Sequence, residues 1–149
     1  MRATLANDGD VGSWLEIVRE VEPLFGPMPD FETTLVRKIG QRGAVCVRAD
    51  DGRQVLGGML LGGAAPEGWI RWLAVRSSAR GRGLGHVLVA EAIRRFSGFA
   101  TVSLDTFRED NEGGRPARRL YERMGFNPGP LIGADGVLRQ RYVLRLAGR

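Results

Sequence analysis

A strand, a glycine-rich turn and a helix follow one another within residues 69–96, and this stretch constrains the fold more than any other part of the sequence. Residues 70–75 form a short apolar run, which is typical of a buried strand. Residues 76–82 are mostly small or basic and predict a loop. A helix is predicted next, because apolar side chains recur at helical spacing at Leu84, Val87, Leu88, Ala92 and Phe96.

The turn between this strand and this helix has the composition of an anion-binding site. The first turn of a helix presents unpaired backbone N–H groups, and the helix dipole favours negative charge there. Gly81, Gly83 and Gly85 carry no β-carbon, so an anion can approach the backbone closely. Arg80 and Arg82 add positive charge. The turn therefore predicts a phosphate-binding site.

Two common phosphate motifs do not fit this turn. A dinucleotide fingerprint needs a third glycine where the sequence has His86, and a P-loop needs a lysine, whereas the only lysine is Lys38. The stretch instead resembles the acyl-CoA motif of the GNAT superfamily of N-acetyltransferases, which is Arg or Gln, two residues, Gly, one residue, then Gly or Ala.

The resemblance implies roles for residues in both the strand and the turn. The turn residues would hold the pyrophosphate of acetyl-CoA, and the end of the strand would hold its pantetheine arm through backbone groups freed by a bulge or splay. The implied cofactor-binding residues are Leu73, Val75, Arg80, Gly81, Arg82, Gly83, Leu84 and Gly85.

A second resemblance lies in the segment Leu120-Tyr121-Glu122-Arg123-Met124-Gly125-Phe126. GNAT proteins commonly carry a similar segment in the helix after the fifth strand. The resemblance implies that Tyr121 is catalytic and protonates the departing thiolate of CoA. A phenol is a neutral donor at pH 7, so it is chemically suited to that role. The alternative is that Tyr121 is a core aromatic residue whose hydroxyl reaches a partner.

The sequence departs from the GNAT pattern at three positions. Gly114 stands where an asparagine is common, and Ser77 stands where a proline is common. Trp69 stands where some members carry a glutamate that acts as the general base. The remaining candidates for a base, chosen by charge alone, are Glu32, Glu67 and Asp105. We expect these to be solvated carboxylates, and deprotonation relayed by water is an equal alternative.

Residues 1–149 are predicted to form a single acetyltransferase domain of mixed α/β class, with a mostly antiparallel central sheet flanked by helices, as in the GNAT fold. Strands are expected at residues 1–5, 44–48, 54–61, 70–75, 101–107, 126–132 and 139–146. Helices are expected at residues 11–22, 31–39, 83–96 and 115–124. Asp10 and Asp30 are expected to cap the first two, and Pro23, Gly26, Pro27 and Pro29 to break the first. A turn is expected at residues 134–136.

The cysteine and histidine content limits the chemistry. Cys46 is the only cysteine, so no internal disulfide can form, and we interpret it as a small buried hydrophobic residue. His86 is the only histidine and is interpreted as a surface or packing residue. One cysteine and one histidine are too few for a zinc site, so no metal is expected. We expect a cytoplasmic protein, because no signal peptide or apolar run near 18 residues occurs.

The predicted function is transfer of an acetyl group from acetyl-CoA to a primary amine of a small molecule or peptide. The acceptor is expected between the first two helices and the loop at residues 128–137, with Trp14, Phe25 and Phe31 as lining residues. An acyl-CoA-binding regulatory module without turnover is an alternative. A nucleic-acid-binding protein is suggested only by the net charge of +5, and the sequence lacks an aromatic-plus-basic motif. We therefore expect no nucleic-acid or membrane partner, and a homodimer is left open.

Overall fold

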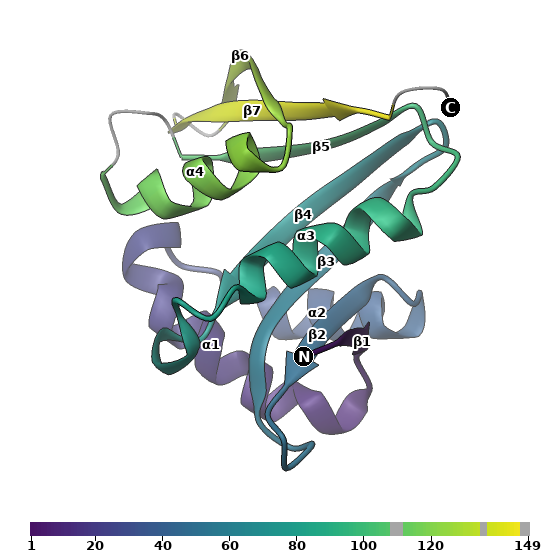
Figure 1. Cartoon of the computed structure of the whole chain (residues 1–149). Helices are drawn as coiled ribbons and strands as arrows, with labels where there is room; N and C mark the ends of the chain where they lie inside the picture. The colour runs from purple at the N-terminus through teal and green to yellow at the C-terminus, as the bar shows by residue number, and fades with distance from the viewer. Residues whose placement is uncertain (108–111, 135–136, 147–149) are drawn as a thin grey trace. The chain divides into compact units, whose positions relative to one another are not determined.

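The computed structural model describes residues 1–107, 112–134 and 137–146. Within them, the strands β1 to β7 join in one sheet in the order β1-β2-β3-β4-β5-β7-β6 (Figure 1). The recorded pairs are antiparallel except for β4 and β5, which are parallel. The predicted mixed α/β class with a mostly antiparallel sheet is therefore confirmed.

The elements follow the predicted order, with some changes in length. The strands are β1 (Ala3–Leu5), β2 (Ala44–Arg48), β3 (Val55–Ala64), β4 (Glu67–Val75), β5 (Thr101–Thr106), β6 (Asn127–Ala134) and β7 (Val137–Arg145). The helices are α1 (Val11–Phe25), α2 (Phe31–Gly40), α3 (Leu84–Arg95) and α4 (Arg115–Arg123). The turn predicted at residues 134–136 lies partly outside the described residues, since 135 and 136 are not among them.

Of the four residues predicted to break the first helix, only Pro23 lies inside it, and the helix ends directly before Gly26. Helix α1 continues through Pro23 to Phe25, and the N–H of Gly26 bonds to the carbonyl of Glu22 over 2.7 Å. A proline removes one helical hydrogen bond. Pro23 is exposed and lies in the last turn, so the helix loses little by including it. Strand β3 extends beyond the predicted end at residue 61 to Ala64, and β4 begins at Glu67 instead of residue 70, so that only Ala65 and Pro66 lie between them.

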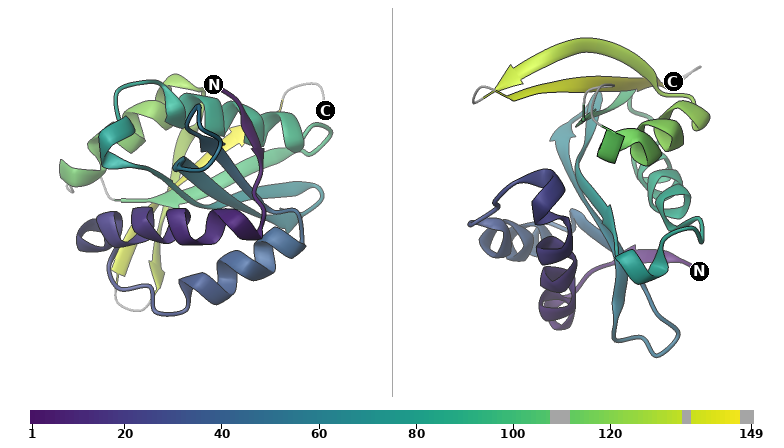
Figure 2. Two further views of the ribbon diagram at one scale, coloured as in Figure 1. Left: turned by 90° about the horizontal axis from the view of Figure 1, so that it is seen from below. Right: turned by 90° about the vertical axis from the view of Figure 1, so that its left-hand side faces the viewer.

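The chain divides into two compact units, which are residues 1–61 with 72–92, and residues 62–71 with 93–149. In the first unit, two adjacent glycines of β3 show which helix covers which face of the sheet. A β-carbon on Gly57 would meet Leu88 of α3, and one on Gly58 would lie 2.5 Å from the ring of Trp14 of α1. Successive strand residues point to opposite faces, so α1 and α3 cover opposite faces of these strands (Figure 2).

An aromatic cluster fills the space between α1, α2 and the sheet in the first unit. Trp72 of β4 contacts the rings of Trp14, Phe25 and Phe31, with centroid distances of 6.0, 5.9 and 4.8 Å. Trp14 is fully buried and Phe31 is nearly so. Trp14 therefore belongs to the hydrophobic core, and the expectation that it lines an acceptor site is wrong.

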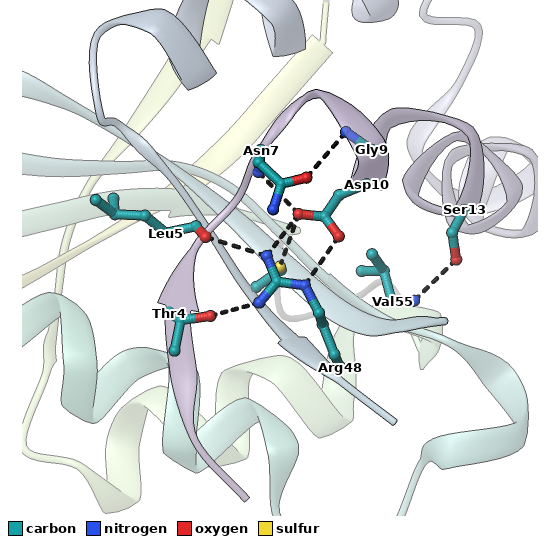
Figure 3. A network of polar contacts seen from close by, with 9 residues as sticks. Thr4, Leu5, Asn7, Gly9, Asp10, Ser13, Arg48 and Val55 are labelled. Carbon is teal, nitrogen blue, oxygen red and sulfur yellow. Dashed lines mark hydrogen bonds and ion pairs between the residues drawn. The ribbon is translucent and has the colours of Figure 1, made fainter. Parts of the chain in front are cut away.

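A buried ion pair ties the N-terminal strand to the start of α1 in the same unit (Figure 3). Arg48 donates to both carboxylate oxygens of Asp10, over 2.9 Å from Nε and 2.6 Å from Nη2. The same guanidinium donates to the hydroxyl of Thr4 and the carbonyl of Leu5 in β1. Asp10 also accepts from the N–H of Asn7, so its side chain does not cap α1. The predicted cap bond at Asp10 is therefore wrong, and Asp30 likewise makes no side-chain cap bond to α2.

Burial and the ion pair together shift the pKa values of Asp10 and Cys46. Burial alone would raise the pKa of Asp10, but hydrogen bonds from Arg48 and Asn7 and the charge of Arg48 outweigh it, so the pKa lies below its usual value of 3.8. Burial, with the nearby charge of Asp10, raises the pKa of Cys46 to about 12. Cys46 is fully buried and protonated at neutral pH, as expected for a packing residue.

In the second unit, helix α4 packs on one face of the strands β5, β7 and β6. The ring centroids of Tyr121 in α4 and Tyr142 in β7 lie 6.1 Å apart. The hydroxyl of Tyr142 also donates to Glu122 of α4 over 2.7 Å. Because side chains alternate along β7, Arg141 and Val143 belong to the opposite face of the sheet from α4.

Among the described residues, no helix has both the length and the apolar character needed to span a membrane.

We expect Asp10→Asn to lower the free energy of unfolding by about 2 kcal/mol at pH 7, because it leaves the guanidinium of Arg48 without its counter-ion. A carboxyl group whose pKa is depressed by folding contributes stability above its unfolded pKa, and that stability is lost as the pH falls through the folded pKa. The difference between the wild type and the variant should therefore shrink below about pH 4. Urea unfolding at several pH values measures it, and Asp8→Asn, at an exposed position in the same turn, is the control.

Candidate functional site

The predicted anion-binding turn is an exposed loop that leads from β4 into α3 in the first unit. Gly81 and Gly83 are exposed and have φ angles of +80° and +79°, a region that residues with a side chain rarely adopt. A β-carbon on either glycine would meet no other atom within 4 Å. The space in front of both glycines is therefore open, which suits close approach of an anion to the backbone.

The first turn of α3 supplies backbone donors at the end of this loop. The N–H of Val87 bonds to the carbonyl of Gly83 over 3.1 Å. The N–H groups of Leu84, Gly85 and His86 come before that bond and have no partner within the helix. The imidazole of His86 is exposed, in agreement with its interpretation as a surface residue. Three free donors and the positive end of the helix dipole thus meet at the loop.

Two exposed arginines border the same loop. The Nε of Arg80 lies 3.4 Å from the carbonyl of Val75, and Nη2 of Arg82 lies 3.4 Å from the carbonyl of Ser78. Both contacts are long for hydrogen bonds, so neither side chain is strongly held. Each guanidinium therefore keeps donors that can turn toward an anion at the loop.

Arg76 anchors the start of this loop, and the sequence analysis did not identify it. Its side chain is buried, with Nε donating to the carbonyl of Val55 over 2.8 Å and Nη2 donating to the carbonyl and hydroxyl of Ser13, each over 3.0 Å. Its Nη1 also lies 2.9 Å from the carboxylate of Glu16. The sequence shows an arginine directly after an apolar strand, which could have indicated an anchoring residue. Arginines are numerous in this chain, however, so this position did not distinguish Arg76 from the others.

The next loop residue is also attached to α1. Glu20 accepts from the N–H of Ser77 over 2.9 Å and from its hydroxyl over 3.1 Å. These hydrogen bonds, the backbone bond first, hold the pKa of Glu20 below its usual value. Ser77 stands where the GNAT pattern usually has proline, and a proline could not donate this backbone bond. The departure at Ser77 therefore has a local structural reason in this chain.

The strand β4 carries the residues predicted to hold the pantetheine arm. Leu73 and Val75 are both half-buried, and they alternate with Trp72 and Ala74 along the strand. The recorded parallel pairing of β4 with β5 covers Glu67–Ile70 and Thr101–Leu104. Strand β5 continues to Thr106 in its pairing with β7, so the described ladder between β4 and β5 ends before either strand does.

Tyr121, the predicted proton donor, lies in α4 of the second unit. Its side chain is buried, and burial raises its pKa to about 12, so the phenol is protonated at neutral pH. Its ring packs against Phe126 and Tyr142. Among the described residues its hydroxyl makes no hydrogen bond, in contrast to that of Tyr142. The proton of Tyr121 is therefore not committed to another group of the described chain.

The space around Gly114 explains why an asparagine is absent at this position. A β-carbon on Gly114 would lie 2.5 Å from Cβ of Phe107 and 2.8 Å from Nη1 of Arg118. Both distances are far shorter than van der Waals contact. Phe107 and Arg118 thus occupy the volume that a larger residue at position 114 would need. Asn111, which could replace the missing asparagine, lies outside the described residues.

The three candidate bases occupy different environments. Glu32 and Glu67 are exposed, as expected for solvated carboxylates. Asp105 differs, because both of its oxygens accept hydrogen bonds from Arg141, over 2.8 and 3.1 Å. Asp105 is exposed as expected, and its carboxylate is in addition paired with the guanidinium of Arg141. No group of three or more potential metal-binding side chains occurs in the described part of the chain.

Comparison of the sequence with protein-family models gives one assignment. A model described as an acetyltransferase (GNAT) domain matches residues 41–128, which is more than half of the chain. This range contains the loop, β4, α3 and Tyr121. A search of curated protein sequences finds no match.

Several solved acetyltransferase structures share the fold. A chain from the NatC complex bound to Gag peptide and CoA is 19% identical, with a TM-score of 0.76, over 99% of this chain and 100% of that one. The PaiA N-acetyltransferase of Thermoplasma acidophilum with coenzyme A is 15% identical, with a TM-score of 0.72, over 97% and 98%. The ribosomal-protein-S18-alanine N-acetyltransferase of Escherichia coli is 20% identical, with a TM-score of 0.70, over 98% and 95%.

We expect Arg76→Met to lower the free energy of unfolding by about 2–4 kcal/mol, because it leaves the carbonyls of Val55 and Ser13 without their donor. Urea unfolding measures the change. Glu16→Gln is the matched control: its side chain is 51% exposed, so loss of this partner alone should cost less than about 1 kcal/mol. Equal stability of Arg76→Met and the wild type would contradict the anchoring role.

Proposed function

Because the chain belongs to the GNAT acetyltransferase domain family, we propose that it transfers the acetyl group of acetyl-CoA to a primary amine. The observation that carries this proposal is the open loop in front of Gly81 and Gly83, beside the free N–H groups of α3. In the proposal this loop holds the pyrophosphate of CoA, while Arg80 and Arg82 neutralise its charge. CoA in the structures of the NatC and PaiA relatives supports acetyl-CoA as the co-substrate.

The pantetheine arm is proposed to run along the end of β4. The strand ladder recorded between β4 and β5 ends at the pair of Ile70 and Leu104. Backbone groups of β4 beyond that point, including those of Leu73 and Val75, can then bond to the amide groups of the arm instead of to β5. This matches the bulge or splay that the GNAT resemblance implies.

The proposed chemistry is direct attack of the amine on the thioester. The nitrogen lone pair forms a bond to the carbonyl carbon, and the carbon–sulfur bond breaks. Tyr121 donates its phenolic proton to the sulfur as the thiolate leaves, and the surplus proton of the new amide nitrogen passes to water, which restores the phenol. A phenol with a pKa of about 12 remains a donor across the physiological range.

The acceptor is proposed to be a small-molecule or peptide amine. Two of the structural neighbours act on or bind peptide or protein chains, as their names state: Gag peptide for the NatC complex and ribosomal protein S18 for the Escherichia coli enzyme.

We further propose that water relays the amine proton away, since Glu32 and Glu67 are exposed and Asp105 is paired with Arg141. The cytoplasmic location, the single-domain organisation and a homodimer stay predictions.

Binding of CoA at the loop can be measured by thermal unfolding. A ligand at 100 times its Kd stabilises the folded state by about 2.7 kcal/mol, which is roughly 5–10 °C for a chain of this size. CoA, acetyl-CoA and desulfo-CoA should all raise the Tm, since the sulfur is not the anchor. Gly83→Val should remove most of the rise, because its branched side chain would fill the open space at the loop.

Gly98→Val is the matched control for this experiment. Gly98 also has a positive φ, of +92°, and open space around it, but it lies in the connection between α3 and β5. Without ligand, Gly98→Val should lower the Tm as Gly83→Val does. With CoA, its Tm should still rise by as much as that of the wild type. The absence of any shift with saturating CoA would remove the proposed function, while a shift without thiol release from any amine would favour a regulatory module.

The role of Tyr121 can be tested by removing its hydroxyl. We expect Tyr121→Phe to lower kcat by roughly 100-fold or more, with little change in KM for acetyl-CoA, because a general acid acts in the transition state. Release of CoA thiol measures the rate. Tyr142→Phe is the control, since it removes the hydroxyl of the only other tyrosine and should leave kcat nearly unchanged. An unaltered kcat in Tyr121→Phe would leave Tyr121 as a packing residue.

A further inference from the structure

We propose that Trp69, Arg71 and Arg141, here called the Arg–Trp cluster, bind a carboxylate group carried by the amine acceptor. The proposal rests on the acetyl transfer proposed above and names the class of its acceptor. The three residues belong to the second unit. Trp69 stands where some GNAT proteins carry a glutamate base, and the GNAT motifs quoted above assign no role to Arg71 or Arg141. Two guanidinium groups lie over one indole ring, and only that of Arg141 is engaged in an ion pair, with Asp105.

The geometry of the cluster holds both guanidinium groups in place. The Cζ of Arg71 lies 4.6 Å from the centroid of the Trp69 ring, and that of Arg141 lies 4.7 Å from it. These distances are within the range of cation–π attraction. A guanidinium stacked on an aromatic ring loses less freedom when it binds an anion, because its plane is already oriented.

The strand register brings the three residues to one face of the sheet. Trp69 pairs with Ser103 of β5, and Asp105, two residues further, pairs with Arg141 of β7. Arg71 follows Trp69 by two residues in β4, so both side chains point to the same face. That face is opposite to the one on which α4 packs. Arg71 is exposed.

The charge of the cluster matches a single carboxylate. Arg141 is paired with Asp105 through two hydrogen bonds of 2.8 and 3.1 Å. The described residues place no carboxylate in an ion pair with Arg71. Two guanidinium groups and one carboxylate leave one positive charge, which a monoanion neutralises. The contact between Arg141 and Asp105 is bidentate, and an arginine can bind the carboxylate of a ligand with the same geometry.

The position of the cluster in β4 connects it to the proposed transfer. The pairing of β4 with β5 ends at Ile70 and Leu104, and Arg71 and Asp105 are the residues that follow in the two strands. Arg71 precedes Leu73, the first residue assigned to the pantetheine arm, by two residues in the sequence. The cluster and the residues proposed for the pantetheine arm thus belong to the same strand, β4.

The experiment compares two acceptors that differ only in a carboxylate. Glycyl-glutamic acid amide and glycyl-glutamine amide have the same α-amine, and CoA thiol release from acetyl-CoA gives kcat/KM for each. We expect the wild type to prefer the glutamic acid peptide by about 10-fold or more, as one charge-assisted hydrogen-bonded contact allows. Arg71→Gln should reduce this preference to near one, mainly through KM.

Arg145→Gln is the matched control, since Arg145 is an exposed arginine on the same face of β7, four residues beyond Arg141. It removes the same charge and should keep most of the preference. Equal use of both peptides by the wild type, or a preference that survives in Arg71→Gln, overturns the proposal and leaves the cluster as surface packing.

A binding measurement separates failure of the site from failure of acetyl transfer. The chain has three tryptophans, so the indole N–H signal of Trp69 can be assigned with Trp69→Phe. In the presence of CoA, glycyl-glutamic acid amide should shift that signal in the wild type but not in Arg71→Gln. A shift without turnover of either peptide supports the site and counts against acetyl transfer to this acceptor. No shift and no rate preference overturns the site.

Discussion

The buried guanidinium of Arg76 is the interaction on which the arrangement of the loop between β4 and α3, proposed to bind CoA, depends. It joins the end of β4 to the carbonyl of Val55 in β3 and to Ser13 in α1. Because Arg76, the first residue of the loop, is bonded to both β3 and α1, the rest of the loop can be rich in glycine and exposed. Glu20 adds a second attachment through Ser77. The turn proposed to bind an anion is in this way attached to a rigid base, which would limit the entropy that a bound pyrophosphate has to remove.

The sequence predicted those features that depend on local patterns. The apolar run at residues 70–75 and the helical spacing after Leu84 identified β4 and α3, because strand and helix periodicities are properties of neighbouring residues. The glycines of the loop were identified for the same reason. The fold class followed once the family pattern was combined with the order of elements.

Features that depend on distant contacts could not be predicted in the same way. Asp10 looked like a helix cap, but Arg48, 38 residues later, offers it a buried ion pair. Asp105 looked solvated, and Arg141 engages it from another strand. Gly114 departs from the GNAT pattern, and Phe107 and Arg118 fill the space next to it. In each case the contacting residue is brought near by the sheet register or by packing. A single sequence does not reveal either.

The contact between Gly58 and Trp14 links two positions that the sequence separates by 44 residues. Because the indole occupies the place of any side chain at position 58, neither residue can change alone without loss of packing. Homologous chains should therefore show correlated exchange, with a smaller residue at position 14 wherever position 58 gains a side chain. The residues of the aromatic cluster around Trp72 are constrained by packing in the same way. We therefore expect substitutions that alter substrate specificity to accumulate on the exposed strand faces and not beneath α1.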